Sequence, residues 1–255
     1  MIVLHYILDV FLKSVEMLAW SILPCIIITV LMQYLTKSLW MGLGNLIGLR
    51  RLVYISSPGV AVHELSHAFF CVIFRHRITK MELFSVGSDG TLGYVNHAYD
   101  PGSFYQRIGN FFIGTGPVWG GFTAIYLLSV WLLPSGAQMN TQDVGAGMAS
   151  FFSALARLDL WLGWRGWLWL YLVIVISANI TLSPPDIKGA LDGLLAIVIF
   201  TFVFTACVLW FYDFPAIFVR HVSQFIITLV PIVVTMLALF VLLHLVLSMI
   251  KRIRC

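Results

Sequence analysis

The stretch Val53–Phe74, VYISSPGVAVHELSHAFFCVIF, contains the motif His63-Glu64-Leu65-Ser66-His67. As a helix it is long enough to cross a hydrocarbon core, for which about 20 residues suffice. His63 and His67 then lie one turn apart on the same face, so both imidazoles can bind one zinc ion. Glu64 lies beside them, where it can act on a water molecule. Because histidines and a carboxylate are costly in lipid, the stretch predicts a functional metal site inside a membrane protein.

The composition agrees with a membrane location. The chain has 255 residues, of which 60% are hydrophobic and only 10% are charged, whereas a soluble domain usually carries about 25% charged residues. We therefore expect one membrane domain over residues 1–255, with the lipid bilayer as its surroundings. The net charge of +4 is small and scattered, so it does not favour a nucleic-acid partner.

The apolar runs predict an α-helical polytopic protein with about six transmembrane helices. They are roughly Met17–Leu35, Val53–Phe74, Phe111–Leu133, Trp164–Leu182, Ala190–Phe211 and Phe225–Ile250. The distribution of Lys and Arg favours cytoplasmic termini, in a multi-pass protein of a cell inner or plasma membrane. A cluster of tryptophans at the start of the fourth span is typical of an interfacial aromatic belt. It comprises Trp161, Trp164, Trp167 and Trp169.

A small β-hairpin is expected directly after the zinc helix, within Met81–Tyr99. Two short strand-like runs flank the turn signal Gly87-Ser88-Asp89-Gly90. Open strand edges are not tolerated against lipid, so the hairpin must lie at the membrane interface or against protein. Its edge offers main-chain hydrogen bonds to an extended substrate segment.

Two histidines do not complete a catalytic zinc site, which usually takes three protein ligands and leaves one position open. The remaining histidines are expected to be structural: His5, His76, His97, His221 and His244.

A carboxylate is the better third ligand. In the stretch NITLSPPDIKGALDG, Ser183 is a suitable N-cap and Pro184 suits the first helical position, which places Asp186 in the first turn. Helix capping alone would also explain an acid there. Asp192 is the alternative ligand, and it points roughly 120° away from Asp186 on the same helix.

Together, these elements resemble the site-2 protease family of intramembrane zinc metalloproteases. The resemblance rests on the HExxH helix, the hairpin, a Gly116-Pro117 element on the next span, and the later Asn…Pro…Asp element. It covers about Val53–Gly193, which implies a metalloprotease core at 53–193 flanked by transmembrane segments at 1–52 and 194–255.

The resemblance implies a role for each matching residue. His63, His67 and Asp186 would be the ligands of one Zn²⁺ ion, Glu64 the catalytic base, and Asn179 a residue that holds the substrate or the oxyanion.

The chain departs from the family at two places. Gly120 stands where the family often has Asn, in Gly-Pro-Val-Trp-Gly rather than Gly-Pro-x-Ala-Asn. The family's Asp usually precedes Gly directly, which matches Asp192-Gly193, whereas Asp186 better matches the distance from Asn179.

The leading functional hypothesis is a zinc endopeptidase that cuts membrane-embedded or membrane-proximal segments of a membrane protein substrate. The alternative is a noncatalytic, metalloprotease-like membrane subunit or transporter-like component that retains a zinc site, with specificity supplied by a partner subunit. Glu64 favours the enzyme, because a structural site does not need a base. A di-iron oxygenase would need several histidine boxes, and the sequence contains one.

Overall fold

The computed structural model describes residues 2–86, 92–134, 144–209 and 214–254. Helices dominate these residues, and one two-stranded sheet interrupts them. In chain order the elements are α1 (Ile2–Ile47), α2 (Leu49–Ile55), α3 (Ser57–Ile73), β1 (Arg77–Glu82), β2 (Tyr94–Ala98), α4 (Phe104–Gly114), α5 (Gly116–Leu132), α6 (Val144–Leu155), α7 (Leu158–Leu162), α8 (Trp164–Ser177), α9 (Pro184–Val208) and α10 (Phe214–Arg254).

Three of the described helices are long and apolar enough to cross a membrane: Val3–Ile47 in α1, α9, and Pro215–Met249 in α10. Helices α4 and α5 would make a fourth span if their 58° bend lies within one crossing. At 17 and 14 residues, α3 and α8 extend only about 25 and about 21 Å, less than the roughly 30 Å of a hydrocarbon core. The expectation of six transmembrane helices is therefore not confirmed and stays a prediction.

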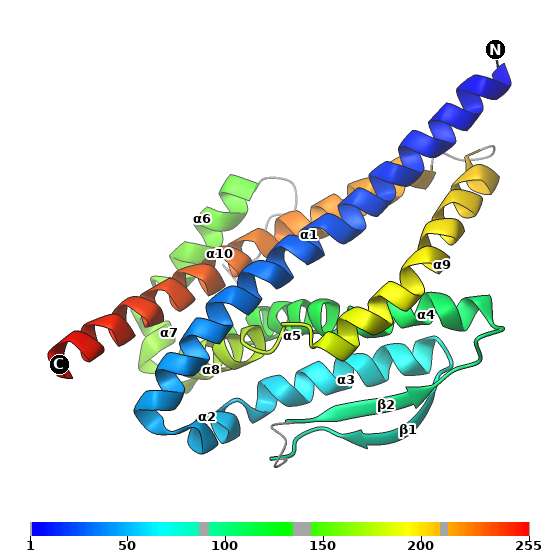
Figure 1. Ribbon diagram of the computed structural model, residues 1–255. Coiled ribbons are helices and arrows are strands. Elements are labelled where there is room, and N and C mark those ends of the chain that lie inside the picture. The colour runs from blue at the N-terminus through cyan, green and yellow to red at the C-terminus, as the bar shows by residue number, and fades with distance from the viewer. Residues whose placement is uncertain (1, 87–91, 135–143, 210–213, 255) are drawn as a thin grey trace.

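The long helices carry much of their apolar surface on the outside. Many large hydrophobic side chains of α1 are more than half exposed, among them Leu4, Ile27 and Tyr34. An apolar surface of this extent is typical of contact with lipid. Helix α1 runs alongside α10 (Figure 1).

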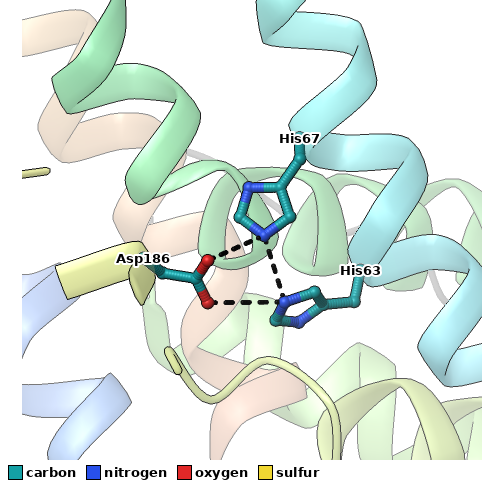
Figure 2. A group of neighbouring side chains, drawn as sticks. All are labelled: His63, His67 and Asp186. Carbon is teal, nitrogen blue, oxygen red and sulfur yellow. Dashed lines mark hydrogen bonds and ion pairs between the residues drawn. The ribbon is translucent and has the colours of Figure 1, made fainter. Parts of the chain in front are cut away.

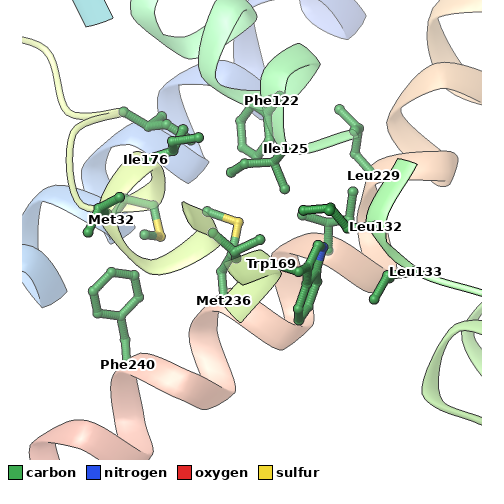
Figure 3. Close-up of a cluster of buried hydrophobic side chains, with 14 of the residues drawn as sticks. Met32, Phe122, Ile125, Leu132, Leu133, Trp169, Ile176, Leu229, Met236 and Phe240 are labelled. Atoms are coloured by element: carbon green, nitrogen blue, oxygen red, sulfur yellow. The ribbon is translucent and has the colours of Figure 1, made fainter. Parts of the chain in front are cut away.

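The hydrophobic core lies where α1, α5, α8 and α10 meet, and Figure 3 shows part of it. Trp169 is 1% exposed there, and its indole Nε1 donates a hydrogen bond to Ser129 Oγ at 2.9 Å. Its assignment to an interfacial belt is therefore wrong, whereas Trp164 and Trp167 are exposed. Trp169 can be buried because α5 supplies a partner for its one polar atom.

The predicted helix Val53–Phe74 is in fact broken at Ser56, where α2 ends and α3 begins. Pro58 explains the break, since a proline has no backbone N–H and is tolerated in the first turn of a helix but not in its interior. Both histidines of the motif lie in α3.

The predicted hairpin is present alongside α3 (Figure 1), but its strands differ from the expected ones. β1 begins at Arg77 rather than near Met81, because Arg75 adopts a positive φ of 57° and turns the chain directly after α3. β1 pairs antiparallel with β2, with a register shift between Ile78 and Lys80. The expected turn at Gly87–Gly90 lies outside the described residues.

Candidate metal centre

Three side chains from two helices converge on one point (Figure 2). The Nε2 atoms of His63 and His67 are 3.1 Å apart. Asp186 Oδ2 lies 3.6 Å from His63 Nε2, and Asp186 Oδ1 lies 3.2 Å from His67 Nε2. Two imidazole nitrogens and a carboxylate within these distances can hold a metal ion.

Backbone carbonyls fix the orientation of both rings. His63 Nδ1 donates to the carbonyl oxygen of Asn179, and His67 Nδ1 donates to that of Ile113, each at 2.7 Å. A carbonyl oxygen only accepts, so the proton of each neutral ring is on Nδ1 and each Nε2 presents a lone pair. This is the outer hydrogen bond that histidine ligands of metals usually make.

The centre therefore has a surplus of electron pairs. When both rings are neutral, two Nε2 lone pairs and a carboxylate face one another at 3.1–3.6 Å. A proton on one Nε2 or a metal cation among these groups relieves their repulsion. The donor set thus fits a divalent metal ion such as zinc, although other transition metals also accept imidazole and carboxylate ligands.

Asp186 is aimed at the histidines by the start of α9. Ser183 N donates to Asp186 Oδ2 at 2.7 Å, and Asp186 N donates in return to Ser183 Oγ at 3.4 Å. This reciprocal capping box confirms the helix start predicted at Ser183 and Pro184. Capping and contact with the histidines are thus compatible, since one carboxylate has enough lone pairs for both.

Asp192 lies apart from this cluster, and it is exposed. The glycine that follows it has a packing role of its own: a Cβ on Gly193 would lie 2.2 Å from the backbone nitrogen of Phe111. The Asp-Gly dipeptide thus marks the close approach of α9 to α4, and Asp186 is the aspartate beside the histidines.

Glu64 lies in the same cavity, which has a volume of about 620 Å³. The side chain is largely buried, at 7% exposure. Within the described part of the chain its carboxylate makes no hydrogen bond or ion pair that would occupy it. Residues 92–97 of the hairpin line the same cavity, and a Cβ on Gly93 would lie 2.9 Å from Glu64 Cγ, so the hairpin packs closely against Glu64.

Asn179 also lines the cavity, where its backbone oxygen orients His63. Its side-chain amide donates to the carbonyl oxygen of Val175 at 2.8 Å. The side-chain oxygen is the group available to a substrate, and the expected role in substrate binding stays a prediction.

Gly120 does not face the metal centre but packs α5 against α3. A Cβ on Gly120 would lie 1.9 Å from Ser66 Oγ and 2.6 Å from Ser66 Cβ. Ser66 therefore fills the space that a side chain would need, which explains the departure from the family's Asn at this position.

His76 and His97, which were expected to be structural, lie close to the site. His76 is buried, and its Nδ1 lies 3.0 Å from His97 Nδ1. His97 belongs to β2 and lines the cavity. Burial lowers the pKa of both rings, and for His97 the neighbouring His76 and His67 rings lower the pKa further, to about 4. The bounds of β2 decide which residues of the hairpin face α3. Correct strand bounds were therefore the one sequence signal that could have indicated His97.

No family model, no curated protein and no solved structure matches the chain. Function is therefore inferred from the chemistry of the site.

Proposed function

We propose that the protein is a zinc-dependent intramembrane endopeptidase, which hydrolyses peptide bonds of membrane-embedded or membrane-proximal protein segments. The observation that carries the proposal is the convergence of His63, His67 and Asp186 beside an unoccupied carboxylate base, Glu64, in one cavity. The resemblance to the site-2 protease family supports the same reaction.

Zinc is the proposed metal, as one ion held by His63, His67 and Asp186. Nitrogen and carboxylate ligands suit it, and three protein ligands are the usual number for a catalytic zinc site. A zinc ion held there would supply a Lewis acid for the scissile carbonyl and for the attacking water.

Glu64 is proposed as the general base. It follows His63 directly on α3, and no described side chain competes for its carboxylate. It would take a proton from the attacking water and pass it to the leaving amine, so that one group serves both proton transfers. A purely structural metal site has no use for an unpaired, largely buried carboxylate, which is costly to bury.

β2 is proposed to bind the substrate as an extended strand. A helical peptide bond is shielded by its own hydrogen bonds, so a transmembrane substrate must unwind before cleavage. In a two-stranded sheet, β2 has one edge that β1 does not pair. That edge would supply main-chain hydrogen bonds to the unwound segment, and Asn179, which lines the same cavity, would also contact it.

The test is cleavage by purified protein in nanodiscs of defined lipid composition. Suitable probes are tagged single-span reporter proteins whose apolar helix contains a central Gly-Gly pair, since such a helix unwinds readily. We expect cleavage that chelation abolishes and zinc restores, with one zinc ion per chain by elemental analysis. Bound zinc without cleavage of any reporter, in the parent and in Glu64→Gln alike, would instead support a noncatalytic subunit.

A further inference from the structure

His97 faces the metal cavity from the hairpin, and its hydrogen bonding differs from that of the metal-site histidines. In His63 and His67, Nδ1 donates a hydrogen bond to a backbone carbonyl oxygen and Nε2 faces the cluster. In His97, Nδ1 contacts His76 Nδ1 at 3.0 Å, and among the described residues Nε2 has no hydrogen-bond partner. Nε2 of His97 is therefore available to accept a hydrogen bond from, or donate one to, a bound molecule.

The proton positions in this pair follow from His76. Its Nε2 lies 2.8 Å from the carbonyl oxygen of Gln106, which only accepts, so His76 Nε2 carries a proton. Burial of His76, at 6% exposure, disfavours its charged form, and the neutral ring therefore has an unprotonated Nδ1. His97 Nδ1 must then be the donor in the contact between the rings.

The consequence for His97 is a defined tautomer. With its proton on Nδ1, the neutral ring presents a lone pair at Nε2. His76 is held in turn by the Gln106 carbonyl and by stacking on Tyr99, with ring centroids 5.2 Å apart and an interplanar angle of 15°. Because His97 lines the cavity, the pair provides a fixed hydrogen-bond acceptor at a wall of the cavity that the metal-site residues also line.

We propose that His97 Nε2 accepts a hydrogen bond from a main-chain N–H of the peptide bound in the metal cavity, with His76 as the residue that positions it. This inference rests on the proposed function, because it takes a peptide as the ligand. A segment that has lost its helical hydrogen bonds has unpaired N–H donors, and leaving a buried donor unpaired is costly. A fixed acceptor on β2 meets that need close to the metal-site residues.

The first test reads the tautomers directly. Long-range proton–nitrogen correlation spectra of ¹⁵N-histidine-labelled protein in detergent micelles distinguish a protonated from an unprotonated ring nitrogen. Assignment uses His76→Gln and His97→Gln. We expect His76 to be protonated at Nε2 and His97 at Nδ1 only. A proton on His97 Nε2 would overturn the proposal. So would two zinc ions per chain falling to one in His97→Gln, since a metal would then lie between the rings.

The second test adds the ligand. A synthetic peptide copying the cleavage region of the Gly-Gly reporter is titrated into the zinc-loaded Glu64→Gln variant, which retains the cavity. We expect the ¹⁵N resonance of His97 Nε2 to shift on saturation in the direction of hydrogen-bond acceptance, whereas His221, which is exposed, does not respond. Absence of a response at His97 Nε2 contradicts the proposal.

Two matched substitutions of His97 distinguish the role of Nε2 from that of Nδ1 in the cleavage assay. The carbonyl of Gln reaches the place of Nε2, whereas Asn reaches only that of Nδ1. We expect His97→Asn to lower kcat/KM about 3- to 10-fold, as for loss of one hydrogen bond, mainly through KM, and His97→Gln to retain most activity. Equal losses in both variants would contradict an acceptor role.

The outcomes distinguish this inference from the function on which it rests. If the peptide shifts the Nε2 resonance but no reporter is cleaved, the acceptor role holds and the proposed reaction is wrong. If reporters are cleaved with zinc while Nε2 does not respond, the reaction stands and the role of His97 is wrong.

Discussion

Asp186 Oδ1 lies 3.2 Å from His67 Nε2, although Asp186 belongs to the first turn of α9 and His67 to α3. The contact depends on α9 starting at a proline and on Ser183 holding the carboxylate in a capping box. The positive end of the α9 dipole also favours a negative charge at this position. A helix start thus supplies the carboxylate that completes the cluster.

The first prediction concerns which aspartate holds the metal. Asp186→Ala should lower zinc affinity by more than the roughly 10- to 100-fold that loss of an outer hydrogen bond costs, because it removes a ligand. Asp192→Ala is the matched control on the same helix and should leave affinity unchanged. Zinc titration with a competing chelator measures both, and metal loss confined to Asp192→Ala would reverse the assignment.

Glu64→Gln should leave zinc bound and reduce reporter cleavage by roughly 10²- to 10⁴-fold, the usual contribution of a general base. The amide keeps the size of the side chain but cannot take up the proton. Cleavage and zinc content are measured on the same preparation. Near-parental turnover in this variant would remove Glu64 from the mechanism.

Proline substitutions along β2, from Tyr94 to Ala98, test strand addition by the substrate. Where the lost N–H pairs with β1, proline should lower Tm. Where the lost N–H lies on the free edge, proline should spare Tm and zinc content but reduce cleavage by about 3- to 10-fold. Thr79→Pro, at the register shift in the other strand, also removes the hydrogen bond from Thr79 Oγ1 to the Asn96 carbonyl, so it is the control for a general disturbance of the sheet. Full activity at every position would place the substrate between the helices instead.

The lowered pKa of His97 predicts a pH dependence of stability. An unfolded histidine has a pKa near 6.5, whereas burial and the His76 and His67 rings lower the pKa of folded His97 to about 4. Between these values only the unfolded chain binds the proton. The contribution to stability is therefore complete above about pH 6.5 and is lost as the pH falls towards about 4.

Thermal unfolding in detergent at several pH values over this range measures the effect. His97→Gln should show a smaller fall in Tm on acidification than the parent protein. Both proteins share every other ionisable group, so the difference between their slopes reports His97 together with its contact to His76. Identical slopes for the two proteins would contradict the assignment.

Gly120→Ala should destabilise the fold by about 1–3 kcal/mol, as overpacking of a tight contact does. The new Cβ would lie 1.9 Å from Ser66 Oγ, so α3 and α5 must move apart. Gly189→Ala is the control, because its Cβ would meet nothing within 4 Å and alanine favours a helix by up to about 1 kcal/mol. Chemical denaturation in mixed micelles compares them, and equal stabilities would exclude the close contact.

The features that the sequence by itself determined are local. The HExxH spacing on a helix places His63 and His67 on one face, and Ser183 with Pro184 starts α9 where it was expected. The hairpin was predicted from turn and strand residues that lie close together in the chain. Each of these depends on backbone preferences and spacing within a few residues, which sequence reveals directly.

Only the tertiary structure decided which faces meet. It brought Asp186 rather than Asp192 to the histidines, buried Trp169 against Ser129, and placed His97 in the wall of the metal cavity. These outcomes depend on how α3, α9 and the hairpin pack, and packing is set by long-range contacts such as that of Gly193 with α4. A residue's spacing along its own helix or strand fixes its direction relative to its neighbours, but not which other element lies in that direction.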